Sequence, residues 1–153
     1  MSDFYIYLKV EPYLEHFIKN AFGDPVEVDR DSPEARIIRE FISKTPQGEI
    51  PDIGEGSNLR VAIPYFKEAD PRVYNYMGKN AKAALIDSFD HLLKLCMMKE
   101  LGTLENNRRG EISKQIYAWM EKHGIPDNET NWYTISQKYY RLRKKYLKNN
   151  IKL

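Results

Sequence analysis

The chain has 153 residues, of which 42% are hydrophobic, and a net charge of only +2. A chain of this length folds as one domain or as two small ones packed together, and its core needs no disulfide. The single cysteine, Cys96, excludes an internal disulfide and suits a reducing compartment. No apolar run approaches the roughly 20 residues of a membrane helix, and the N-terminus lacks a signal-peptide pattern, so we expect a cytoplasmic protein without a membrane partner.

Hydrophobic periodicity predicts a small β-α-β-α-β unit in residues 1–66. Alternating apolar residues predict strands with one buried face, and apolar residues at helical spacing predict amphipathic helices. Pro12 and the Ser32-Pro33 pair supply helix starts, because proline is tolerated in the first turn of a helix and serine caps it. The predicted strands and helices, in chain order, cover 4–10, 12–22, 26–28, 32–44 and 59–63.

Residues 67–153 are predicted to be helical. A loop rich in glycine and proline covers 46–58 and precedes this part. The longest helix is expected from about 80 to 101, and Gly102 ends it. A helix around 112–120 then stops at Gly124, and a last helix covers about 130–148. The fold class is therefore α+β and predominantly helical, with the two parts sharing one domain or forming two, and with a helix-turn-helix-like pair at the end.

Charge is distributed unevenly along the chain. Residues 1–107 hold 13 Lys and Arg against 18 Asp and Glu, a net charge of −5, whereas residues 108–153 hold 11 against 4, a net charge of +7. No acidic residue follows position 129. Such a cationic helix favours binding to a phosphate backbone, where each cation releases condensed counterions. The candidate nucleic-acid-binding residues are Arg108, Arg109, Lys138, Arg141, Arg143, Lys144, Lys145 and Lys148.

Other interpretations of the basic segment stay open. Cations near a helix C-terminus are favoured by the helix dipole, and the acidic part of the same or a second chain could neutralise them. In that case the protein is an interaction module or a homo-oligomer. Tyr133 and Tyr140 favour stacking on bases if the target is single-stranded. The turn 124–129 is longer than that of a standard helix-turn-helix, which weakens the likeness to duplex DNA readers.

No catalytic or metal-binding constellation is recognisable, so we expect a non-enzymatic protein without a cofactor. Asp87 and His91 are spaced i,i+4, but no second pair completes a metal site. His123 has no evident carboxylate or nucleophile companion, and Cys96 is interpreted as a small buried hydrophobic residue. The glycines of the loop 46–58 match neither a Walker motif nor a dinucleotide-binding motif.

Five stretches resemble a family of small uncharacterised bacterial proteins associated with prophages and other mobile elements. They are FYIYLKVEPYL (4–14), FGDPV (22–26), DPRVYNY (70–76), IYAWM (116–120) and QKYYRLR (137–143). The resemblance implies no known activity and no site residues. A mobile-element setting favours a task linked to DNA.

Overall fold

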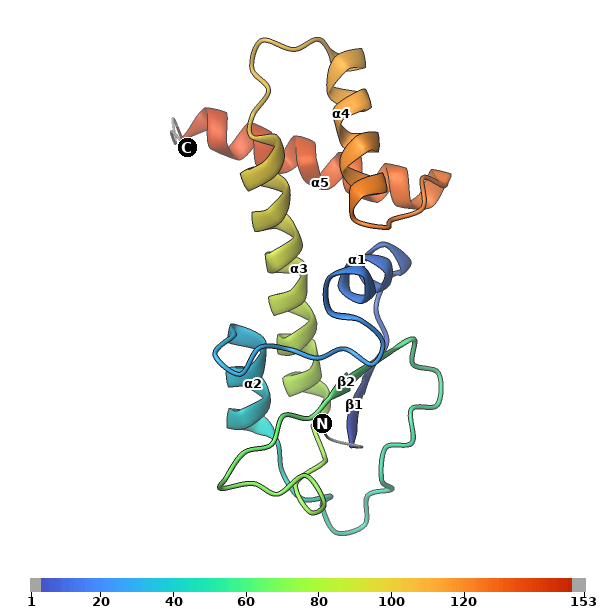
Figure 1. Cartoon of the computed structure of the whole chain (residues 1–153), viewed down its shortest axis with the longest axis vertical. Coiled ribbons are helices and arrows are strands. Elements are labelled where there is room, and N and C mark those ends of the chain that lie inside the picture. The colour runs from blue at the N-terminus through green and yellow to red at the C-terminus, as the bar shows by residue number, and fades with distance from the viewer. Residues whose placement is uncertain (1–3, 150–153) are drawn as a thin grey trace.

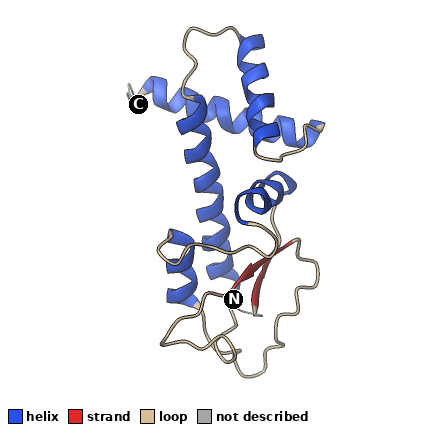
Figure 2. Ribbon diagram, viewed as in Figure 1, coloured by secondary structure: helices blue, strands red, loops and turns tan. Residues whose placement is uncertain are grey.

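The computed structural model describes residues 4–149, in which a small antiparallel sheet lies near one end of a long helix and two further helices lie near its other end (Figure 1). The predicted α+β, predominantly helical fold is confirmed (Figure 2). The elements in chain order are β1 (Tyr5–Leu8), α1 (Pro12–Phe22), α2 (Pro33–Phe41), β2 (Leu59–Ala62), α3 (Lys79–Leu101), α4 (Arg109–Lys122) and α5 (Glu129–Lys148).

The sheet consists of β1 and β2, paired antiparallel with Tyr5 opposite Ala62 and Leu8 opposite Leu59. Alternate residues of β1 are buried, as the period of two predicted. The expected strand at 26–28 is wrong, because Val26 makes only an isolated parallel bridge to Val61. Val26 donates to the Arg60 carbonyl at 2.9 Å and then leaves the sheet edge, so too few backbone groups pair to form a strand.

The first two helices begin as their sequences predict. Pro12 occupies the first turn of α1, and the Ser32 hydroxyl accepts a hydrogen bond from the Ala35 amide at 3.1 Å at the start of α2. However, α2 ends at Phe41, before the expected limit at residue 44. The backbone after Phe41 is extended, because the Ser43 amide donates a hydrogen bond to the Tyr76 carbonyl at 2.9 Å. This long-range backbone bridge replaces the expected last turn of the helix.

The long helix α3 organises the molecule. It runs through the middle of Figure 1, with the sheet and α2 near its N-terminal end and with α4 and α5 near its C-terminal end. Its buried side chains belong to a single hydrophobic cluster that extends from Ile6 to Tyr139. Gly102 ends the helix at φ +66°, as predicted. The proposed division of the chain at residue 66 stays a prediction.

The turn between α4 and α5 is a Schellman motif, as the Gly124-Ile125 pair predicts. The Ile125 amide donates to the Met120 carbonyl at 2.9 Å, and Gly124 adopts φ +70°. A side chain at Gly124 would also collide with Asn20 of α1, whose Nδ2 lies 2.9 Å from the Cβ position. Asn128 then caps α5 by accepting from the Asn131 amide at 2.9 Å.

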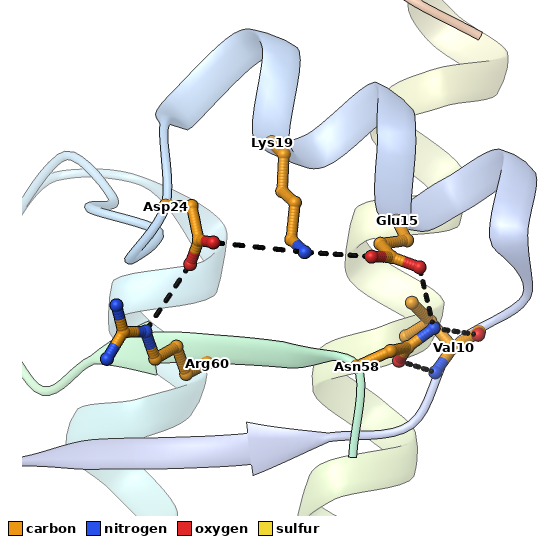
Figure 3. Close-up of polar contacts among 6 residues, drawn as sticks. All are labelled: Val10, Glu15, Lys19, Asp24, Asn58 and Arg60. Carbon is orange, nitrogen blue, oxygen red and sulfur yellow. Dashed lines mark hydrogen bonds and ion pairs between the residues drawn. The ribbon is translucent and has the colours of Figure 1, made fainter. Parts of the chain in front are cut away.

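Asn58 fastens the end of the long loop to the start of α1 (Figure 3). Its side chain makes a reciprocal pair with Val10, donating to the Val10 carbonyl at 2.7 Å and accepting from the Val10 amide at 2.9 Å. It also donates to the Glu15 carboxylate at 3.1 Å. These contacts fix the loop 46–58 at its C-terminal end.

Within residues 4–149, none of the helices has the length and apolar composition needed to cross a bilayer.

Candidate nucleic-acid interface

The basic face of α5 borders a groove of about 1070 Å³, whose other wall is the start of α4. The lining positions on α5 recur at intervals of three and four residues, which places them along one face of the helix. The residues that line the groove are Arg109, Ser113, Trp132, Tyr133, Ser136, Gln137, Tyr140, Arg141, Arg143, Lys144, Leu147 and Lys148.

Cations line this groove without any acidic residue among the described part of its walls. They are Arg109, Arg141, Arg143, Lys144 and Lys148. All belong to the set predicted from the sequence to bind nucleic acid, and the fold brings them onto one surface. Like charges gathered along a concave wall add their potentials, so the groove attracts anions. That these residues bind nucleic acid stays a prediction.

The contacts of these cations are to neutral groups. Arg143 donates from Nε to the Thr103 carbonyl at 2.6 Å. Arg141 donates to the Gln137 side-chain oxygen at 3.2 Å, and the Arg109 guanidinium lies 5.1 Å from the centre of the Tyr140 ring. Within residues 4–149, no carboxylate lies within 4.0 Å of the charged atoms of any of the five. Their positive charge is therefore not neutralised by the chain that the structure describes.

Lys138 is an exception, because it has a counterion within the chain. Its ammonium group lies 3.3 Å from the Asp90 carboxylate on α3 and 5.3 Å from the centre of the Tyr13 ring. The ammonium group thus lies between α1, α3 and α5 and has a counterion within the chain. The expectation that all cations of the last helix lack an internal counterion is wrong at this position.

Lys145 and Arg108 lie outside the lining of the groove. Lys145 follows Lys138 by seven residues on α5, so it projects from the same edge of the helix, away from the groove. Arg108 is the N-terminal cap residue of α4, without a side-chain capping bond. Both are exposed. They add to the positive field around α4 and α5 without facing the groove itself.

Aromatic side chains accompany the cations in the groove. Tyr133 is 62% exposed, so its ring face is accessible. Trp132 stacks on Tyr117 with ring centres 3.9 Å apart and planes 6° from parallel, which ties the start of α5 to α4. The Tyr140 hydroxyl is buried and has no hydrogen-bond partner among the described residues. A buried hydroxyl without a partner is costly.

Asp90 anchors α1 and α5 to the middle of α3. It accepts a hydrogen bond from the Tyr13 hydroxyl at 2.8 Å and lies 3.2 Å from the ammonium group of Lys94. Burial alone would raise the pKa of Asp90, but the Tyr13 hydroxyl and the ammonium groups of Lys138 and Lys94 outweigh it and hold the pKa below its ordinary value. Burial, followed by the Asp90 carboxylate, raises the pKa of Tyr13.

Cys96, Glu100 and His123 form a cluster that sequence reasoning missed. The expectation that His123 has no carboxylate companion is wrong, since its Nε2 lies 2.8 Å from Glu100 Oε1. Cys96 is half-buried rather than buried, and its thiol donates to the same oxygen at 2.8 Å. The i,i+4 spacing of Cys96 and Glu100 was a visible signal, but His123 reaches them only through the tertiary fold. Asp87 and His91 are not part of this cluster.

The ionisation of the cluster follows from these contacts. Burial, together with the hydrogen bond to Glu100, raises the pKa of the Cys96 thiol to about 12. Burial acts to raise the pKa of Glu100, but the hydrogen bonds from Cys96, Lys122 and His123 lower it to about 2. At neutral pH the thiol is therefore protonated and donates to an ionised carboxylate.

A second hollow of about 630 Å³ lies beside β2 and differs in charge. Its walls hold Glu27 and Asp70 as well as Arg30 and Arg72. Arg72 forms an ion pair with Asp70 at 2.7 Å, so its charge is already matched. The groove on α5 is therefore the better candidate for binding a polyanion.

Comparison with protein-family models, curated proteins and solved structures found no match to this chain, so the resemblance to prophage proteins stays a prediction.

Proposed function

We propose that the protein is a non-enzymatic DNA-binding protein and that it binds DNA through the groove between α4 and α5. The observation that carries the proposal is the groove's lining, where cations gather without a described acidic neighbour. A nucleic-acid backbone supplies the missing negative charge, and the release of its counterions drives binding. The proposal includes a cytoplasmic location, in keeping with the free cysteine.

The aromatic residues of the groove favour single-stranded over duplex DNA. Single-strand binding proteins combine a cationic groove with aromatic side chains on which bases stack. Tyr133 offers an exposed ring in the same groove as Arg141 and Lys144, two to three helical turns before them on α5. In duplex DNA the bases are stacked on each other, so this ring would have no base to stack on. The connection 123–128 also exceeds the turn of a standard helix-turn-helix.

The test is fluorescence anisotropy with a labelled single-stranded oligonucleotide and with its duplex, over a range of salt concentrations. The triple variant Arg141→Glu, Lys144→Glu and Lys148→Glu should abolish binding. These side chains are exposed and form no ion pair with the described residues, so we expect the variant to fold. Three neutral substitutions with Gln should reduce the slope of log K against log salt by about 2 for a single strand. Tyr133→Ala should weaken single-strand binding by about tenfold or more.

The matched control makes the same total change in charge at three positions away from the groove. Lys9→Glu, Arg36→Glu and Lys67→Glu alter three exposed cations of the N-terminal part by the same total charge. We expect this variant to bind with only a small loss, since its substitutions lie away from the groove. Equal losses in both triple variants would reduce the effect to net charge and would overturn the groove as the site.

The alternative is a protein-interaction module in which the acidic part of a second copy fills the groove. Light scattering would then report an oligomer that dissociates as salt rises, and the anisotropy of the oligonucleotide would not change at low salt. That pair of results would replace the proposal. A monomer that binds the single strand more tightly than the duplex would support it.

A further inference from the structure

The cluster of Cys96, Glu100 and His123 joins the last turns of two helices. Cys96 and Glu100 lie one turn apart near the end of α3, and His123 is the C-terminal cap residue of α4. Their ligand atoms lie within 4.8 Å of one another. Thiolate, carboxylate and imidazole are the three protein ligands that zinc accepts. The fold therefore gathers, from distant parts of the sequence, a set of side chains with metal-binding chemistry.

The imidazole of His123 is held in place by aromatic neighbours. Its ring centre lies 4.6 Å from that of Trp119 and 5.5 Å from that of Phe17. Its side chain is 15% exposed. A ligand whose ring is fixed before binding loses little conformational entropy when the metal arrives. The orientation of Nε2 toward Cys96 and Glu100 is thus built into the core contacts of α1 and α4.

The arrangement does not suit nucleophilic catalysis. In a catalytic triad the acid holds one ring nitrogen of the histidine while the nucleophile uses the other. Here both partners approach the same nitrogen, with His123 Nε2 at 2.8 Å from Glu100 Oε1 and at 3.7 Å from Cys96 Sγ. Three donor atoms that converge on one point are the arrangement of a metal site.

The distances between the donor atoms are close to those of a tetrahedral zinc site. Zn–S and Zn–N or Zn–O bonds of about 2.3 and 2.0–2.1 Å place tetrahedral ligand atoms roughly 3.3–3.6 Å apart. The Cys96 Sγ to His123 Nε2 distance of 3.7 Å already fits. The two contacts of Glu100 Oε1, both 2.8 Å, need to lengthen by about 0.5–0.8 Å. A small rotation of the Glu100 side chain, which is 24% exposed, supplies that movement.

Lys122 does not block the site. It contacts Glu100 through the other carboxylate oxygen, Oε2, and its side chain is 65% exposed. Oε1 is therefore the oxygen available to a metal. Lys122 can keep its contact or swing into solvent without moving a helix.

We propose that Cys96, Glu100 and His123 bind a zinc ion, which links the C-terminal end of α3 to that of α4. The zinc ion replaces the proton of the Cys96 thiol, and that proton leaves to solvent. Three protein ligands leave a fourth position, which water occupies. The mixed sulfur, nitrogen and oxygen set favours Zn²⁺ over Mg²⁺ and Ca²⁺, which prefer oxygen ligands. The site is separate from the groove on α5 and does not depend on DNA binding.

The test uses the full chain, stripped of metal with a chelator and titrated with Zn²⁺ in a calorimeter. We expect one ion per chain and a rise of about 5–10 °C in the unfolding temperature when zinc is present at 100 times its Kd. Cobalt(II) reports the ligands, because a tetrahedral site with one thiolate gives an intense visible spectrum and a sulfur-to-metal charge-transfer band. Mg²⁺ at the same concentration should have no effect.

Single substitutions assign the ligands. Cys96→Ser and His123→Gln should each weaken zinc binding more than about 100-fold, since even the loss of a residue that only supports a ligand costs 10–100-fold. Glu100→Gln should weaken it by a smaller factor, because the amide oxygen remains a poor ligand. The matched control is His91→Gln, an exposed histidine elsewhere on α3, which should leave the affinity unchanged.

Two results would overturn the proposal. One is a flat calorimetric titration with folded wild-type protein at zinc concentrations up to the millimolar range. The other is binding that survives in Cys96→Ser while circular dichroism shows that the variant is folded. If Cys96→Ser does not fold, the cobalt spectrum of the wild type decides, because a spectrum without the charge-transfer band excludes the thiolate.

Discussion

Cations near the two ends of α3 occur in opposite electrostatic settings. Around the sheet, Lys19 lies between two carboxylates, 2.8 Å from Glu15 and 3.9 Å from Asp24, and Arg60 lies 3.4 Å from Asp24 (Figure 3). In the groove between α4 and α5, Arg143 contacts a backbone carbonyl, Arg141 a side-chain amide and Arg109 an aromatic ring. Lys19 and Arg60 thus have counterions within the chain, whereas the cations of the groove have none among residues 4–149.

This difference between the two regions affects the electrostatic potential at the protein surface more than it affects the free energy of unfolding. Exposed ion pairs contribute at most about 1 kcal/mol each, so the pairs around the sheet do little to hold the fold together. Their effect is to cancel the potential of that surface. Arg39 with Glu68, and Lys82 with Asp52, repeat the pattern in the same part of the molecule. The net charge of +2 therefore combines an N-terminal part of net charge −5, where several cations are ion-paired, with a C-terminal part of net charge +7, where the cations of the groove are not.

Asp90 lies at the border between these settings, and its loss should have the largest effect on stability. Asp90→Asn removes the charge that Lys138 and Lys94 face and weakens the hydrogen bond from Tyr13. We expect the free energy of unfolding to fall by about 2 kcal/mol, because hydrogen bonds to a charged group contribute roughly 1.5–3 kcal/mol. Urea denaturation measures the change.

Asp87→Asn is the matched control for this variant. Asp87 is exposed and lies one turn before Asp90 on the same helix. Its substitution should change stability by less than about 0.5 kcal/mol. Equal losses in the two variants would show that the charge of α3 as a whole matters, and not the junction of α1, α3 and α5.

The same carboxylate should make part of the stability depend on pH. The pKa of Asp90 is lower in the folded protein than its ordinary value of 3.8, so the ionised form stabilises the fold at neutral pH. As pH falls below that value and through the lower folded pKa, the contribution is lost. The difference in stability between wild type and Asp90→Asn should therefore be constant above about pH 5 and shrink toward zero in acid. A difference that grows in acid would contradict the assignment.

The helices and most of their ends were predictable from the sequence because local rules determine them. Proline at the first turn, the serine cap of α2 and the glycine stop of α4 each act within a few residues. The strand expected at 26–28 and the last turn of α2 were wrong for a different reason. Only Val26 pairs with the edge of β2, and Tyr76 takes the backbone groups of Ser43 that a longer α2 would use. Both pairings join residues far apart in the chain, and no local pattern predicts them.

The candidate groove was only partly predictable. Helical periodicity places Lys144 and Lys148 on one face of α5. It does not reveal that Lys138 forms an ion pair with Asp90 of α3. The cluster of Cys96, Glu100 and His123 was hidden, because His123 lies far from Glu100 in sequence and joins it only after α4 folds back on α3. Charge counts along a chain identify a surplus, whereas the fold decides which charges are neutralised.

The smallest effect on stability is expected when a carboxylate is introduced among the cations of α5. Lys144→Glu gives α5 an acid four residues before Lys148 and three after Arg141, which are favourable spacings. We expect stability to rise by only roughly 0.3–0.8 kcal/mol at low salt and by less at high salt, while DNA binding weakens. Lys144→Gln, which removes the charge without adding a partner, separates the relief of repulsion from the new ion pairs. A variant that loses both stability and DNA binding would mean that Lys144 is already matched, and α5 would then resemble the region around the sheet.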